Sequence, residues 1–299
     1  MSQAASASHT TDLDAITAPA PAVEAWIDRF LDDRPLPGNL REAVKYALLG
    51  GGKRLRPILV VRSCQAVGGD TDAALAPAAA IEMIHAFSLA HDDLPAMDND
   101  DLRRGRPTLH RAYPEAMAIL AGDALTSLAF EAVLRHVQPA AAADIARELA
   151  AATTDMIAGQ VYDTLPDFPD SLAPLDRLKL IHRNKTGALI RCACRMGAIA
   201  GRATATQLDA LTRYAEAIGL MFQVVDDVID CTQSTEHLGK TAGKDAVQNK
   251  LTFPALLGLD ASRAEIARLR AAAHAALEPL GDPAAPLRDL CDYMAVRTK

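Results

Sequence analysis

The stretch FQVVDDVID at residues 222–230 decides the fold, because it sets carboxylates inside a long apolar pattern of helical period. Asp226 and Asp230 are four residues apart, so they share one face of the predicted helix. Carboxylates among Val and Ile side chains cost free energy unless they are paired or bound to a metal. This helix is therefore predicted to be buried on most sides and to present a polar site.

Other long segments repeat the helical period, and glycine and proline clusters separate them. Alanine is the commonest residue, and the enrichment in β-branched and aromatic residues that is typical of strands is missing. No strand-like runs alternate with the helices. The pattern predicts a single-domain, all-α bundle of roughly ten or more helices, built on segments that include 73–90, 116–137, 141–157, 207–229 and 262–277.

Composition excludes several classes of protein. The chain has 299 residues, of which 50% are hydrophobic, so it is too apolar to be disordered. Its 38 acidic and 31 basic residues give a net charge of −7, which argues against nucleic-acid binding. No run of 18 residues lacks a charge, so no membrane span is expected.

The ends and the cysteines indicate location and boundaries. Five scattered cysteines without a CxxC pair favour reduced thiols in a cytoplasmic protein over a disulfide framework or a zinc site. Residues 1–22 lack the basic and apolar regions of a signal peptide and are predicted to be a flexible tail. The folded domain is expected over residues 23–299.

A second acidic cluster follows the apolar helix that ends near Ala90. Five aspartates stand within ten residues, namely Asp92, Asp93, Asp98, Asp100 and Asp101. At that density like charges repel one another unless solvent or cations neutralise them. Two such clusters on one helical scaffold predict the two halves of one metal site, and ligands that are all oxygen favour Mg²⁺ or Mn²⁺. Because Mg²⁺ also prefers phosphate oxygens, a phosphate-bearing ligand is implied.

Basic segments agree with an anionic ligand. Glycines at 50–52 precede Lys53 and Arg56, and Pro57 suits a helix start, a combination that favours anion binding. It is not a Walker loop, because the earlier glycine and the final Ser or Thr are absent. Further basic elements are RRGRP at 103–107, Lys185-Thr186-Gly187, Lys240 and Lys250.

Together these motifs resemble the trans-isoprenyl diphosphate synthase family, and most of all its bacterial farnesyl diphosphate synthases. The resemblance runs in order from about residue 24 to the C-terminus, through GGKRLRP at 51–57, DDLPAMDNDDLRRGRPTLH at 92–110, KTGALI at 185–190, FQVVDDVID at 222–230 and GK at 239–240. It implies a central cavity, a homodimer, and Mg²⁺-dependent head-to-tail condensation of isopentenyl diphosphate with dimethylallyl or geranyl diphosphate.

Site residues follow by matching motif positions. Mg²⁺ would be held by Asp92, Asp93, Asp98, Asp226, Asp227 and Asp230. Isopentenyl diphosphate would be bound by Lys53, Arg56, His85 and Arg104. The allylic diphosphate would be bound by Arg103, Lys185, Gln223, Lys240 and Lys250, with Lys185, Lys240, Thr186 and Gln223 acting at the reacting end. Gln160 and Asp163 would contact these side chains and hold them in position.

One spacing departs from the simplest form of the family. Asp92 and Asp98 are six residues apart rather than four, because two residues are inserted around Pro95. Six residues do not return to the same helical face, so the chain is expected to leave regular helix there. The same insertion is typical of the bacterial members.

Phe87 and Ser88 bear on product length. They precede Asp92 by five and four residues, which places them about 6–8 Å below the metal site along one helix. The bulky ring of Phe87 is predicted to form the floor of the cavity and to stop elongation at the 15-carbon farnesyl diphosphate. The 20-carbon geranylgeranyl diphosphate is the alternative product.

Two other functions fit the sequence less well. A helical di-metal oxidase needs two Glu-x-x-His motifs, and only Glu82-Met83-Ile84-His85 matches. A non-catalytic prenyltransferase subunit would have lost some motif residues, and here all of them are present.

Overall fold

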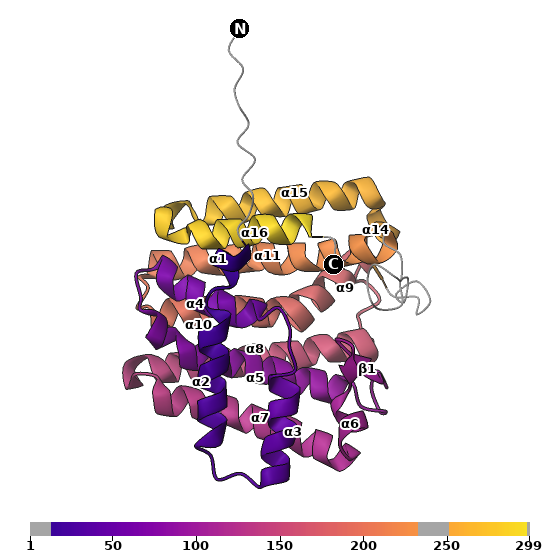
Figure 1. Ribbon diagram of the computed structural model, residues 1–299. Coiled ribbons are helices and arrows are strands. Elements are labelled where there is room, and N and C mark those ends of the chain that lie inside the picture. The colour runs from indigo at the N-terminus through magenta and orange to yellow at the C-terminus, as the bar shows by residue number, and fades with distance from the viewer. Residues whose placement is uncertain (1–12, 233–250, 298–299) are drawn as a thin grey trace.

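The computed structural model describes residues 13–232 and 251–297 (Figure 1). More than ten α-helices and a single two-stranded hairpin make up this part of the chain, which confirms the all-α prediction. The helices that build the body of the molecule are α2 (Ala20–Asp32), α3 (Gly38–Leu48), α4 (Leu55–Ala66), α5 (Thr71–Asp92), α7 (Glu115–His136), α8 (Pro139–Thr164), α10 (Ala188–Ala200) and α11 (Ala205–Thr232).

Shorter elements connect and cover these helices. They are α1 (Leu13–Thr17), β1 (Leu102–Arg103), β2 (Arg106–Pro107), α6 (Leu109–Ala112), α9 (Pro174–His182), the π-helical turn η1 (Arg183–Gly187), α14 (Phe253–Leu257), α15 (Leu259–Ala276), the 3-10 turns η2 (Glu278–Leu280) and η3 (Asp282–Ala284), and α16 (Ala285–Val296). The antiparallel hairpin pairs Leu102 with Pro107 and Arg103 with Arg106.

Helix α5 is the central element. Its first turn is capped by Asp70, whose side chain accepts a hydrogen bond from the backbone N–H of Asp72 at 3.1 Å. Buried alanines along the helix let α4, α7 and α10 pack closely around it. At Gly122 of α7 an added Cβ would lie 2.2 Å from Nε2 of His91, so this glycine leaves room for the imidazole ring between the two helices.

The last helices form a separate layer. α15 and α16 lie side by side across α11 at the top of the molecule (Figure 1). The buried hydroxyl of Tyr214 on α11 donates a hydrogen bond to the carbonyl of Leu287 on α16, 2.7 Å away. This layer fixes the helix that carries the second acidic motif.

The helical region begins before the predicted boundary at residue 23. Residues 13–17 form α1, and Ile16 is only 2% exposed in the core. Residues 20–22 already belong to α2. The sequence predicts a tail over 1–22 because its Ala, Ser, Thr and Pro content is high; helical structure within 13–22 corrects this for that part, with Ile16 buried in the core. Residues 1–12 lie outside the described residues.

Two described helices, α5 and α7, are long and apolar enough to cross a membrane by length and composition alone. Their most apolar windows are 67% and 44% buried inside the protein, respectively. Because the core helix of a soluble protein passes the same test, this finding establishes no membrane span.

Candidate active site

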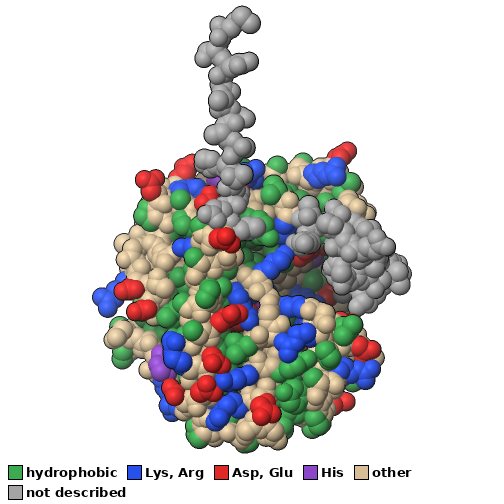
Figure 2. All heavy atoms as spheres, viewed as in Figure 1, with side chains coloured by type: hydrophobic (Ala, Val, Ile, Leu, Met, Phe, Trp, Pro, Cys, Tyr) green, Lys and Arg blue, Asp and Glu red, His purple; other side chains and the backbone are tan. Residues whose placement is uncertain are grey.

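A cavity of about 600 Å³ opens beside the C-terminal end of α5. Its walls are mainly apolar and come from α5, α7 and α8, with Phe87, Leu94, Ile119, Met156, Ile157 and Val161 among the lining residues. Polar groups gather at one end, where Asp92, Lys185, Thr186, His85 and Arg56 also line it. Figure 2 shows Lys and Arg side chains along the rim of a hollow in this region of the surface.

The first acidic motif lies at this polar end. α5 ends at Asp92, and the backbone N–H of Asp98 donates a hydrogen bond to the carbonyl of Asp92 at 2.8 Å. The inserted loop therefore leaves the helix, as its spacing predicts, and returns Asp98 to the helix end. Burial raises the pKa of Asp92 to about 6; Lys185 opposes this rise and the charge of Asp98 adds to it.

The side chain of Asp93 forms an ion pair with Arg103. Its carboxylate, which is only 3% exposed, accepts hydrogen bonds from Nε of Arg103 at 2.9 Å to each oxygen. Arg103 is the last residue of β1, so this ion pair ties β1 to the end of α5. In this structure the carboxylate orients Arg103. The role of Asp93 as a metal ligand, which the resemblance implies, stays a prediction.

Lys185 stands on an unusual local structure. The π-helical turn η1 widens the helix at residues 183–187, and such turns are frequent at functional sites. Gly159 of α8 lets the turn come close, since a Cβ there would lie 2.2 Å from the backbone nitrogen of Lys185. Asp163, one turn further along α8, accepts a hydrogen bond from Nζ of Lys185 at 2.6 Å.

Gln160 completes this side of the cavity. Its two side-chain polar atoms are buried, and neither has a hydrogen-bond partner among the described residues. It lines the same cavity as Lys185 and Thr186. A buried amide without partners costs free energy, so a polar ligand is expected to supply them.

The second acidic motif is partly engaged by the protein itself. Asp226 accepts a hydrogen bond through Oδ1 from Arg297 at 2.7 Å, and that guanidinium also stacks 4.2 Å from the centre of the Phe222 ring. Asp227 is buried and accepts the backbone N–H of Phe253 at 2.8 Å, with Nε2 of His182 3.6 Å away. Asp227 therefore holds α14 against α11.

Gln223 and Asp230 remain half-buried on α11, one turn before and one turn after Asp226. The predicted residues Lys240 and Lys250 lie outside the described residues. Lys53 is described and exposed, in the loop before α4.

A cluster of cations surrounds His85. Burial lowers the pKa of this imidazole well below its usual value, and the charges of Arg56 and Arg104 lower it further. Nε of Arg56 is buried and has no hydrogen-bond partner among the described residues. Glu82 is the carboxylate that offsets part of the positive charge on Arg56 and Arg104. Such a cluster suits a multivalent anion.

Backbone geometry brings this cluster together. Gly51 and Gly52 have φ of 90° and 131°, and at Gly52 a Cβ would lie 2.3 Å from the guanidinium of Arg104. Arg104 itself has a positive φ of 54° and donates a hydrogen bond to the carbonyl of Gly51. Strained residues of this kind cluster at functional sites.

Sequence reasoning missed two arginines. Arg54 has φ of 50°, is 5% exposed, and pairs with Glu82 at 2.8 Å and Glu24 at 2.7 Å. Its place within KRLR was a signal of function, but only the fold shows that it anchors the loop of Lys53 and Arg56. Arg297 had no sequence signal, because its contact with Asp226 joins residues that are far apart in the chain.

Carboxylates of the two acidic motifs are the candidate ligands for a hard cation. Asp92 lines the cavity and is joined to Asp98 by a backbone hydrogen bond, and the raised pKa of Asp92 marks a desolvated carboxylate whose negative charge a cation would stabilise. Arg297 binds Oδ1 of Asp226, and Oδ2 of the same carboxylate is the oxygen that could bind a cation. Oxygen donors of this type match Mg²⁺.

Fold and site together define an all-α protein with a deep apolar cavity whose polar end carries carboxylates and cations. The chain belongs to the polyprenyl synthetase family, whose model matches residues 37–279.

Known proteins agree with this assignment. The chain is 49% identical to geranylgeranyl pyrophosphate synthase 9 of Arabidopsis thaliana over 274 residues, which is 87% of this chain and 75% of that protein. A putative farnesyl-diphosphate synthase from Marinomonas sp. MED121 superposes with a TM-score of 0.81 at 39% identity, covering 95% of this chain and 99% of that one. An FPP/GFPP synthase from Zymomonas mobilis gives 0.82 at 38% identity, covering 95% and 100%. The prediction of a trans-isoprenyl diphosphate synthase is thereby confirmed at the family level, and the chain is a prenyltransferase.

Proposed function

We propose that the chain condenses isopentenyl diphosphate with an allylic diphosphate and elongates the product within the cavity beside α5. The observation that carries this proposal is one mainly apolar cavity of about 600 Å³ that Asp92, Lys185 and Thr186 line together with His85 and Arg56. An apolar chain fits the walls, and two diphosphates fit the two cationic groups.

The two diphosphates have separate binding groups. Arg56, His85 and Arg104, with Lys53, hold isopentenyl diphosphate, and the anion relieves the mutual repulsion of the three cations when it binds. Lys185 and Arg103 hold the allylic diphosphate. Binding both substrates at fixed positions lowers the entropic part of the barrier to their reaction.

Mg²⁺ is the proposed cofactor, with Mn²⁺ as a substitute, and Asp92, Asp98, Asp226 and Asp230 are the residues that would hold it. When bound, it would neutralise the charge that develops on the departing diphosphate. Nζ of Lys185 lies where it can stabilise the same charge, and Asp163 fixes its direction. Apolar walls exclude water from the allylic cation, and the hydroxyl of Thr186 and the amide of Gln223 offer it partial negative charge.

Geranylgeranyl diphosphate is the first candidate for the main product, because the curated relatives at 49% identity are geranylgeranyl pyrophosphate synthases. Farnesyl diphosphate, which the sequence analysis favours, is the second. A specific observation supports the second candidate: Phe87 lines the cavity, with its ring centre 5.5 Å from that of His91.

The test is incubation with isopentenyl diphosphate, each allylic diphosphate and Mg²⁺, followed by chromatography of the dephosphorylated alcohols. A 20-carbon alcohol supports the first candidate and a 15-carbon alcohol the second. If no prenyl alcohol formed while metal and both substrates were present, the proposed activity would be refuted.

We further propose a homodimer formed through α7 and the end of α8. Large apolar side chains are exposed there, among them Leu120 at 55%, Leu134 at 61%, Ile157 at 48% and Leu165 at 70%. Apolar residues exposed along two neighbouring helices are typical of an interface. A second copy of the chain would also cover the cavity, because Ile157 and Leu165 line it.

A further inference from the structure

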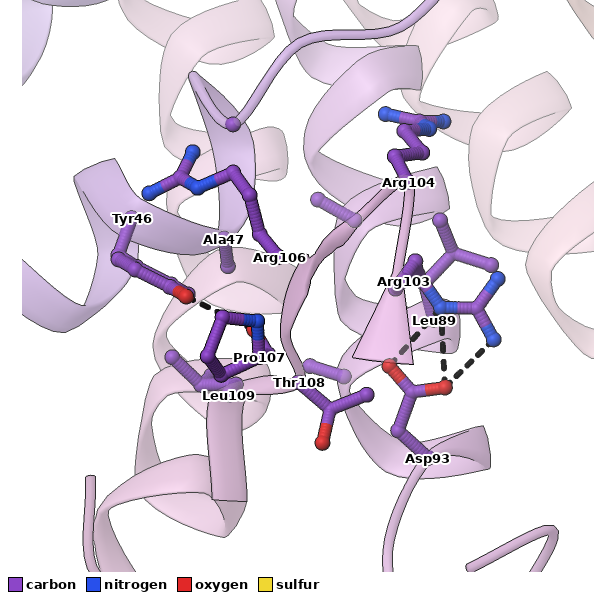
Figure 3. Close-up of a pocket in the computed structure, with 13 residues that line it drawn as sticks. Tyr46, Ala47, Leu89, Asp93, Arg103, Arg104, Arg106, Pro107, Thr108 and Leu109 are labelled. Carbon is purple, nitrogen blue, oxygen red and sulfur yellow. Dashed lines mark hydrogen bonds and ion pairs between the residues drawn. The ribbon is translucent and has the colours of Figure 1, made fainter. Parts of the chain in front are cut away.

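The hairpin β1–β2 carries two arginines of the proposed site, and its contacts hold it between α3, α5 and the glycine loop (Figure 3). Arg103 binds Asp93 at the end of α5. At the turn, Arg104 donates to the carbonyl of Gly51. These two contacts tie β1 and the turn to neighbouring elements, and the antiparallel pairing joins β2 to β1. A third attachment ties β2 itself to a neighbouring helix.

Tyr46 of α3 supplies that third attachment. Its hydroxyl donates a hydrogen bond to the carbonyl of Pro107 at 2.8 Å, and the guanidinium of Arg106 lies over its ring, 4.3 Å from the centre. Figure 3 shows both β2 residues directed toward this one tyrosine. The ring of Tyr113 packs edge-on against Tyr46 at 5.6 Å and fixes its orientation.

The glycine loop also fits around Arg106. A Cβ at Gly50 would lie 2.9 Å from Nη1 of Arg106, so the stacked guanidinium passes directly over this residue. Gly50 follows α3 by two residues and precedes Lys53 and Arg56. Tyr46 and Arg106 therefore connect the loop that begins one half of the cationic cluster to the hairpin that carries Arg104, the other half.

We propose that Tyr46 is a positioning residue for isopentenyl diphosphate, which acts by clamping Arg106 and Pro107 and thereby fixes the distance between Arg104 and Arg56. This inference rests on the proposed function. The pair does not need to touch the substrate. The cation–π contact and the hydrogen bond both stabilise this position of β2, and losing them lets the hairpin move.

Steady-state kinetics on Tyr46→Leu, Tyr46→Phe, Arg106→Ala and the double variant Tyr46→Leu/Arg106→Ala test the clamp. Tyr46→Leu should raise KM for isopentenyl diphosphate about tenfold, with kcat and KM for the allylic substrate within about twofold. Tyr46→Phe keeps the ring, so it should raise KM for isopentenyl diphosphate only about threefold. Because both partners form one clamp, the double variant should be no worse than the more impaired single variant.

Tyr113→Phe is the matched control, since it removes a tyrosine hydroxyl from the neighbouring ring and should leave every KM unchanged. Equal losses in kcat and in both KM values would indicate a merely structural role and overturn the proposal. The proposal would also be overturned if the effects of Tyr46→Leu and Arg106→Ala on KM were additive, or if Arg106→Ala raised KM while Tyr46→Leu did not. Either result would show that Arg106 binds the anion directly.

Hydrogen exchange of the amides at 102–107 in the substrate-free protein separates this inference from the proposed function. Tyr46→Leu should speed that exchange relative to wild type and to Tyr113→Phe, whether or not the protein makes a prenyl product. Unchanged exchange refutes the clamp. A wild-type protein that makes no prenyl product refutes the function and leaves the clamp to be judged by exchange.

Discussion

Phe87 lines the cavity in this structure. Its ring lines the wall about one helical turn below Asp92, where a growing hydrocarbon chain would arrive. We expect Phe87→Ala to lengthen the main product by at least one five-carbon unit, because removing the ring extends the cavity. Chromatography of the dephosphorylated products measures this change.

Phe168→Ala provides the comparison, because that ring stacks on Tyr162 at 5.3 Å and is not among the residues that line the cavity. It should lower stability without altering product length. An unchanged product spectrum for Phe87→Ala would show that another part of the wall sets the limit.

The pH behaviour of His85 follows from its cationic surroundings. Its folded-state pKa lies well below 6.5, because burial and then Arg56 and Arg104 disfavour the imidazolium. As pH falls below 6.5, this histidine is protonated in the unfolded chain but stays neutral in the folded protein. The free energy of unfolding therefore decreases as the pH decreases. We expect the ligand-free wild type to lose stability over that range more steeply than His85→Gln, as measured by urea unfolding.

Nuclear magnetic resonance of the His85 ring gives the complementary measurement. In the ligand-free protein the ring should stay neutral at pH 6. Inorganic diphosphate should raise its pKa, because the anion offsets the charges of the arginines. A ring that titrates near 6.5 without ligand would contradict this account of the cluster.

At the scale of elements, the turn η1 depends on the absence of a side chain at Gly159. A Cβ there would lie 2.2 Å from the nitrogen and 2.6 Å from the Cα of Lys185, both of which are backbone atoms that cannot rotate away. We expect Gly159→Ala to destabilise the protein by about 1–3 kcal/mol and to lower kcat more than either KM, because Lys185 moves away from Asp163 and from the cavity.

Gly38→Ala is the matched control. Nothing lies within 4 Å of a Cβ at that position, and it begins helix α3 far along the chain from η1. Its stability and its kinetics should equal those of the wild type. Wild-type kcat in Gly159→Ala would mean that the close approach of α8 does not position Lys185.

Local patterns predicted the elements that carry the acidic motifs, because helical period and charge spacing are properties of neighbouring residues. α11 contains FQVVDDVID as expected, and the six-residue spacing from Asp92 to Asp98 correctly placed the end of α5. Contacts between residues that are distant in sequence could not be predicted from these local patterns. The pairs Arg103–Asp93, Arg297–Asp226 and Phe253–Asp227 arise only when the helices pack.

The widened turn η1 was also missed, since a π-helical turn differs from α-helix by a hydrogen-bond register and not by composition. The family resemblance still selected Lys185 and Thr186, and both line the cavity. The resemblance indicated which residues belong to the site, whereas the fold shows where their side chains lie and which residues they contact. Product length needs both, because Phe87 is one wall of a cavity formed by three helices.

For the whole molecule, apolar side chains exposed on α7 and at the end of α8 form the face through which we propose that two copies associate. Leu120 and Leu134 are about four helical turns apart and share one face of α7. They are 55% and 61% exposed in a single chain. We expect Leu120→Glu to convert a dimer into a monomer, because it places a charge on that apolar face, and sedimentation velocity measures the change in mass.

Leu257→Glu on α14 is the control, since Leu257 is 42% exposed on a different element and should leave the mass of the wild type unchanged. The monomer should retain its helical content. It should nevertheless lose activity and release shorter products, because Ile157 and Leu165 would leave the apolar cavity open to water at the face that a partner covers. If Leu120→Glu stayed dimeric, the interface would lie elsewhere; if it became monomeric with unchanged products, one chain would complete its own cavity.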